Sequence, residues 1–129
     1  MITVLATSVA AGENAEWTPI FNGKDLSGWS PKFTGEPYGV NYLDTFSVED
    51  GRLVASYDQY ESFDDRFGHL FYHQKLSHFR LRLEYRFVGE QVPGAPSWAF
   101  RNSGIKFHSQ APQRLPKDQR LLVAIETQL

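Results

Sequence analysis

The sequence predicts an all-β protein built as an antiparallel β-sandwich, and four observations lead to this prediction. Apolar and polar residues alternate without a break over 79–87, as in a strand with one face on the core and one in solvent. Asp50-Gly51 separates two short apolar runs and is a strong hairpin signal. Aromatic residues make up 15% of the chain, which suits the space between two sheets, and no segment has a sustained helical period.

The expected elements follow one another along the chain. Residues 17–29 form a short strand with turns at Asn22-Gly23 and Ser27-Gly28, because these residue types favour tight turns. Further strands are expected at 46–49, 52–56, 69–73, 79–87, 103–109 and 121–129. In the fourth of these, the apolar set is expected to lie buried between sheets: Phe79, Leu81, Leu83, Tyr85 and Phe87. The segments rich in proline and glycine are expected to be loops long enough to carry function: 30–45, 88–101 and 110–119.

Composition limits the kinds of function that the chain can have. Its 129 residues have room for one domain with one core. The formal net charge is −2 and the Lys and Arg residues are scattered, so no basic surface for nucleic acid is expected. Cysteine is absent, which excludes disulfides, a thiolate nucleophile and a zinc site made with cysteine.

The first fifteen residues differ from the rest. Residues 2–11 are small and apolar, and the first charged side chain is Glu13. Val9 and Ala11 suit the positions that a signal peptidase recognises before its cut, and the run is too short to span a bilayer. We interpret residues 1–15 as the remnant of a secretory signal that packs on nothing, with a disordered or strand-like N-terminus as the alternative, and residues 16–129 as the domain. The protein is then secreted or periplasmic, with no membrane insertion once this segment is removed.

A polar face is predicted where two strands near the C-terminus lie side by side. Lys106 and His108 have the same parity in one strand, and Glu126 and Gln128 have the same parity in the other. Opposed residues on neighbouring antiparallel strands have Cβ atoms about 4.5–5.5 Å apart. The face would bring together an ammonium, an imidazole, a carboxylate and an amide, which is enough for proton transfer and carbonyl polarisation. The alternative is an ordinary solvated face with a salt bridge.

Further candidates lie on this face or at its rim. Asn102 shares the parity of Lys106, and His69 stands at the start of a strand from which it can reach the face. Trp98 lies in a proline-rich loop, where it suits stacking on a sugar ring or serves only as a local anchor. The acidic residues between 58 and 65 lack the spacing of a calcium loop and are expected to be solvated, so no metal ligands are assigned.

Four segments resemble, in the same order, the segments of one known family. They are F-N-G-K-D-L-S-G-W at 21–29, F-S-V-E-D-G-R-L-V at 46–54, H-F-R-L-R-L-E-Y-R-F at 78–87, and N-S-G-I-K-F-H at 102–108 with I-E-T-Q-L at 125–129. The family is DUF1080, also called the 3-keto-disaccharide hydrolases, and the resemblance covers residues 17–129. It implies a secreted bacterial protein with a concanavalin A-like jelly-roll fold. Members of the family continue beyond the last segment, so the jelly roll is expected to be incomplete at its C-terminus.

The resemblance also implies a reaction. The chain lacks the E-x-D-x-x-E pattern of related jelly-roll glucanases, and the comparable strand has one carboxylate where ordinary glycosidases use two. The implied reaction is cleavage of a 3-keto-glycoside. A base removes the C2 proton, the enolate expels the C1 aglycone, and water then adds to the unsaturated keto-sugar.

Roles follow for the candidate residues. His108 or Glu126 is the base, and Lys106 stabilises the enolate. Contacts with the sugar are assigned to the other candidates, Gln128, Asn102, Trp98 and His69. A divalent cation is the electrophile that some members of the family are expected to use, but this sequence has no convincing ligand set for one. Two other functions stay open: a non-catalytic carbohydrate-binding module, and an accessory domain of a larger secreted enzyme.

Overall fold

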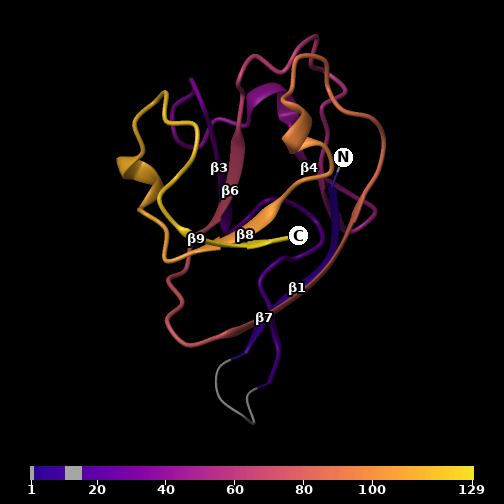
Figure 1. Cartoon of the computed structure of the whole chain (residues 1–129). Helices are drawn as coiled ribbons and strands as arrows, with labels where there is room; N and C mark the ends of the chain where they lie inside the picture. Colours follow the sequence, from indigo (N-terminus) through magenta and orange to yellow (C-terminus); the bar gives the residue numbers. More distant parts are fainter. Residues whose placement is uncertain (1, 11–15) are drawn as a thin grey trace.

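The computed structural model describes residues 2–10 and 16–129 (Figure 1). Within them the chain forms nine strands: β1 (Ile2–Ala10), β2 (Thr18–Pro19), β3 (Trp29–Phe33), β4 (Phe46–Glu49), β5 (Arg52–Ala55), β6 (Gly68–Tyr72), β7 (Arg80–Phe87), β8 (Gly104–Phe107) and β9 (Ile125–Gln128). The helices of this part of the chain are single 3-10 turns: η1 (Tyr42–Asp44), η2 (Ser97–Ala99) and η3 (Pro112–Arg114). None of them is long and apolar enough to cross a membrane.

The strands form three antiparallel sheets. In the largest, β1 pairs with β7 and also with β5 and β2, and β4 extends the sheet from β5. The other two sheets have two strands each, β3 with β6 and β8 with β9. Figure 1 shows β8 and β9 crossing the lower end of β6, and this crossing brings the candidate site together.

The N-terminal segment differs from the expectation that it packs on nothing. Ile2–Ala10 forms β1, which pairs with β7 from Ile2 to Ala10 and with β5 from Ile2 to Val4. Met1 and residues 11–15 lie outside the described residues. Removal of residues 1–15 on export stays a prediction.

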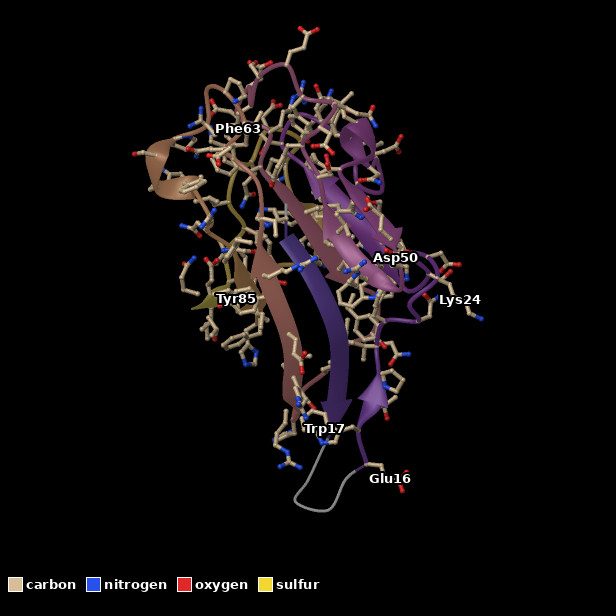
Figure 2. The ribbon with its side chains drawn as sticks, turned by 90° about the vertical axis from the view of Figure 1, so that its right-hand side faces the viewer. Glu16, Trp17, Lys24, Asp50, Phe63 and Tyr85 are labelled. Carbon is tan, nitrogen blue, oxygen red and sulfur yellow. The ribbon has the colours of Figure 1, made fainter. Side chains whose placement is uncertain are left out.

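The two turns that the sequence signals most strongly lie next to each other. Asp50 and Gly51 both have positive φ, 49° and 74°, as a two-residue type I′ hairpin requires. Gly23 has φ 71°, and a Cβ placed on it would lie 3.6 Å from the carbonyl oxygen of Gly51. Figure 2 shows Lys24 and Asp50 at the same edge of the molecule. The Asn22 side chain closes its own turn, because its Oδ1 accepts hydrogen bonds from the backbone N–H groups of Lys24 and Asp25.

Strand β3 corrects the prediction of a loop over 30–45. Trp29–Phe33 pairs with β6 along its whole length, although Pro31 has no N–H to donate. Proline is tolerated in an edge strand, where one side makes no ladder hydrogen bonds, and in the described chain β3 pairs with β6 alone. The remainder of the range, apart from η1, does lack regular structure.

The core lies around β3 and the β4–β5 hairpin. Phe33 is 1% exposed and packs against Phe46, with ring centroids 5.3 Å apart. Its partner across the ladder is Gly68, and a Cβ there would come within 2.3 Å of the Phe33 ring. The other buried apolar side chains are Ile20, Phe21, Val54, Tyr60, Phe63 and Leu122.

Strand β7 forms where it was predicted, but its apolar face is not buried between sheets. Tyr85 is 41% exposed, and Figure 2 shows it at the outer edge of the β7–β1 pair. The remaining members of the set are only partly buried: Phe79, Leu81, Leu83 and Phe87. Alternation predicts which side chains share a face of a strand. Whether that face is buried depends on whether another part of the chain covers it, and in the described chain this face of β7 keeps part of its surface in solvent.

Candidate functional site

Residues 117–120 lie across the β3–β6 ladder and connect it to β9. The backbone N–H of Gly35 donates to the carbonyl oxygen of Lys117 at 2.9 Å. The Arg120 guanidinium pairs with Asp65 at 2.5 Å. Its own carbonyl oxygen lies 3.3 Å from Nε2 of His69. The chain thus passes over one face of β3–β6 before it enters β9.

Lys32 is a buried cation on that face. It is 3% exposed, and its Nζ donates to the carbonyl oxygens of Phe33 at 2.6 Å and Lys117 at 3.0 Å. Burial lowers the pKa of its ammonium. The β3–β6 register sets Lys32 directly opposite His69, so both side chains lie on the same side of the ladder. Lys32 was not among the residues predicted from the sequence, because its segment was expected to be a loop.

Lys106 and Glu126 form an ion pair across the β8–β9 ladder. They are direct partners in its register, and Nζ of Lys106 donates to Oε2 of Glu126. Their side chains remain 19% and 34% exposed. The Glu126 side chain crosses over Gly104, where a Cβ would come within 2.1 Å of Oε1. The glycine therefore leaves the room in which the carboxylate reaches Lys106.

His69 lies within electrostatic reach of that ion pair. Burial lowers the pKa of its imidazole; the charges of Lys106 and Lys32 act in the same direction, whereas the hydrogen bond to Arg120 and the charge of Glu126 act against it. Four side chains from four strands therefore form one cluster, which we call the four-strand cluster: Lys32 of β3, His69 of β6, Lys106 of β8 and Glu126 of β9.

Three predicted sugar contacts form a hydrogen-bonded row beside this cluster. Gln128 is on β9, and its Nε2 donates to Oδ1 of Asn102 and, at 2.8 Å, to the carbonyl oxygen of Ser103. Asn102 in turn donates from Nδ2 to the carbonyl oxygen of Trp98 at 2.8 Å. The indole of Trp98 stacks on Phe67 with an interplanar angle of 5° and is 58% exposed. The row therefore ends in an open aromatic surface.

His108 lies apart from the cluster. Strand β8 ends at Phe107, and His108 has φ 52°, so the parity that links it to Lys106 ends with the strand. Its ring meets the edge of Phe107 at 6.0 Å, and no contact with Lys106 or Glu126 is found in the described chain. The structure thus pairs Lys106 with Glu126 but does not bring His108 to them.

Two hollows of the described surface lie elsewhere. One, of about 80 Å³, is lined by Tyr57, Phe63 and the loop 88–101. The other, of about 400 Å³, lies beside Asn22, Tyr72 and His73. Neither hollow is lined by Lys106, His108 or Glu126.

The acidic side chains of the site do not fit a divalent cation. Glu126 is held by Lys106 and Asp65 by Arg120. Among the described residues, no group of three or more His, Asp or Glu side chains is arranged to hold a metal ion. No step of the chemistry below is therefore assigned to a metal.

Comparison with known proteins decides the family. The family model described as the 3-keto-alpha-glucoside-1,2-lyase-like domain matches residues 16–129. The chain belongs to this family. The resemblance found in the four sequence segments is thereby confirmed, and so is the all-β fold, since the lyase-like family has a concanavalin A-like sandwich of which the three sheets form part. No curated protein and no solved structure matches the chain.

The geometry gives this lyase-like domain the parts of a proton-transfer site. An ammonium is held by one carboxylate, a partly buried imidazole lies nearby, and amides and an open indole form the rim. Three contributors were not found from the sequence: Lys32, the Arg120 carbonyl and Gly104. The register sets Gly104 opposite Gln128, so only the observed position of the Glu126 side chain indicates that it passes over this glycine.

Proposed function

We propose that this protein cleaves 3-keto-glycosides by elimination. The observation that supports the proposal most directly is the pairing of Lys106 with Glu126 on a sheet face that has an imidazole and amide groups beside it. The family supports a carbohydrate-related role; elimination is the reaction that the resemblance implies, and the chemistry of these side chains is consistent with it.

The reaction needs three things from the protein. A base takes the C2 proton, which the C3 ketone makes acidic, and the electron pair of the C–H bond moves into a C2=C3 enolate. The Lys106 ammonium then faces the developing charge on the C3 oxygen, where an electrostatic donor is most effective. The enolate re-forms the ketone as the C1–O bond breaks, a proton goes to the aglycone oxygen, and water adds across the unsaturated sugar.

An ordinary glycosidase site is less consistent with these residues. Such enzymes use two carboxyl groups about 5–9.5 Å apart, one on each side of the bond that breaks. Glu126 is the acidic side chain of the four-strand cluster, and its charge is already matched by Lys106. Elimination does not need a pair of carboxyl groups, because either Glu126 or a histidine can serve as its base.

A carbohydrate-binding module is the second candidate, because of one observation. The row from Gln128 through Asn102 to Trp98 presents amides and an open aromatic ring, a combination that suits sugar binding without chemistry. In that case Lys106 and Glu126 are an ordinary cross-strand ion pair. Secretion or a periplasmic location belongs to this proposal in either case.

The decisive experiment compares two substrates. The protein is incubated with a 3-keto-glucoside and with its unoxidised parent, and release of the aglycone is followed. We expect release from the keto sugar alone, and a slower reaction or loss of label to water when C2 carries deuterium. Equal cleavage of both sugars would contradict elimination, and binding of both without cleavage would favour the binding module.

A further inference from the structure

The backbone selects one tautomer of the neutral His69 ring. Its Nε2 lies 3.3 Å from the carbonyl oxygen of Arg120, and a carbonyl oxygen can only accept a hydrogen bond. Nε2 must therefore carry the proton. A neutral imidazole has one N–H, so Nδ1 keeps its lone pair and is the nitrogen that can take a proton.

The surroundings of His69 favour the neutral ring. The groups that act on it are the ammonium groups of Lys32 on β3 and Lys106 on β8, the carboxylate of Glu126 on β9, and the Arg120 carbonyl of segment 117–120. Burial is the main effect and lowers the pKa of the ring; the charges of Lys106 and Lys32 act with it, whereas the hydrogen bond to Arg120 and the charge of Glu126 act against it. A base must be unprotonated before it can act, and this environment keeps His69 ready near neutral pH.

The two bases considered from the sequence are less suitable. Glu126 forms an ion pair with Lys106, and protonation of its carboxylate would leave the Lys106 ammonium without a counter-charge. His108 lies beyond the end of β8, is exposed, and contacts Phe107. The parity that would set it beside Lys106 ends with the strand, which removes the geometric reason for assigning it the proton transfer.

We propose that Nδ1 of His69 is the base that removes the C2 proton of a 3-keto-glycoside. This inference rests on the proposed function and deepens it. The C–H electron pair passes into the enolate, whose oxygen faces Lys106, and the proton on Nδ1 is handed to the aglycone oxygen as the C1–O bond breaks. Nε2 stays protonated throughout, and the Arg120 carbonyl holds the ring in place. Glu126 becomes a positioning residue that acts through Lys106.

The first test measures the ring without any substrate. The complete chain is labelled with ¹⁵N and its histidines are observed by long-range ¹H–¹⁵N correlation, with H69Q used to assign the signals. We expect His69 at pH 7 to be neutral with the proton on Nε2. A proton on Nδ1, or a doubly protonated ring at that pH, would overturn the inference even if the protein cleaves keto sugars.

The second test compares matched histidine variants. H69Q keeps a side chain that can donate to the Arg120 carbonyl but cannot take a proton, and we expect turnover to fall by about 10²–10⁴-fold. We expect the same loss in exchange of the C2 label, and the acidic limb of the kcat/KM profile to disappear. H78Q is the control and should keep full turnover. His78 is exposed, and among the described residues its side chain hydrogen-bonds only to Ser77.

The third variant separates the inference from the proposed function. H108Q should retain more than a tenth of the turnover, and a greater loss in H108Q than in H69Q would assign the base to His108. If the unaltered protein releases no aglycone from a 3-keto-glucoside, the proposed function fails, whereas full activity in H69Q defeats this inference alone. A thermal unfolding curve for each variant shows whether a loss of turnover reflects loss of the fold.

Discussion

The β3–β6 ladder and the β8–β9 ladder each hold a lysine, and they hold it in opposite ways. Lys32 is buried and satisfied by two backbone carbonyl oxygens. Lys106 keeps part of its side chain in solvent and is satisfied by the carboxylate of Glu126. The comparison indicates that the first lysine ties segment 117–120 to the sheet, while the second presents a charge at the surface. Position in the fold, more than residue type, separates a structural cation from a functional one.

The largest expected effect tests the functional half of this comparison. Replacing Lys106 with Met removes the charge that faces the enolate oxygen but keeps most of the side-chain length. Turnover on a 3-keto-glucoside should fall by about 10²–10³-fold. The thermal midpoint should change little, because a partly exposed ion pair contributes little to stability. Unchanged turnover in K106M would make the pair an ordinary salt bridge.

The next effect tests the structural half. Replacing Lys32 with Met leaves the carbonyl oxygens of Phe33 and Lys117 without their donor, at a cost of about 1–3 kcal/mol in the free energy of unfolding. Urea unfolding of K32M and K106M side by side measures the contrast. The comparison breaks down if K106M proves the less stable of the two, or if K32M is more stable than the unaltered chain.

A smaller effect should follow from the glycine under Glu126. In Gly104→Ala the new methyl group occupies the space of the carboxylate, so Glu126 must move away from Lys106. We expect turnover to fall by about tenfold with KM less affected, since a small misplacement of a catalytic group slows the chemical step. The control is Gly89→Ala, where nothing lies within 4 Å of the added methyl group. Its effect, if any, is on stability, because Gly89 has φ 76°. Equal turnover in both variants would show that the position of Glu126 is unimportant.

The smallest effect is a pH dependence of stability on the β3–β6 side. Burial lowers the pKa of His69 in the folded chain below its ordinary value of 6.5. Between the folded and the unfolded pKa of His69, the unfolded chain binds more protons than the folded chain. The contribution of His69 to the free energy of unfolding is therefore present above pH 6.5 and is lost as pH falls through the folded pKa. Thermal midpoints between pH 8 and pH 4 should decline less in H69Q than in the unaltered chain or H78Q. Parallel declines in all three would mean that His69 is as freely protonated in the folded chain as in the unfolded one.

Local patterns predicted much of what the structure contains. The Asp50-Gly51 hairpin needs two residues that accept positive φ, and this requirement is readable from two letters. The extended conformation of 80–87 follows from alternation, and the pairing of Lys106 with Glu126 follows from parity once the two strands are neighbours. Each of these depends on residues close together in the chain, or on one assumption about which strands pair.

Other features were out of reach because they depend on distant residues. Pro31 and the turn residues around it indicated a loop, yet pairing with β6 makes the segment a strand. The face of β7 that carries Tyr85 looked like core, but alternation cannot say whether a second layer covers it. The continuity of 103–109 placed His108 beside Lys106, whereas the positive φ of His108 ends that parity.

The sequence by itself therefore determined the family, the all-β fold class and the ion pair of the candidate site. The fold class and the ion pair follow from short-range turn chemistry and from the two-residue period of strands, which each segment carries on its own. The family was indicated by the resemblance of the four segments. Only the tertiary structure decided that Lys32 is buried, that His69 meets the carbonyl oxygen of Arg120, and that both lie near Lys106 and Glu126. The reason is physical: these contacts join residues up to 85 positions apart (from Lys32 to Lys117). Segment 117–120 creates them by crossing a ladder whose pairing no local pattern specifies.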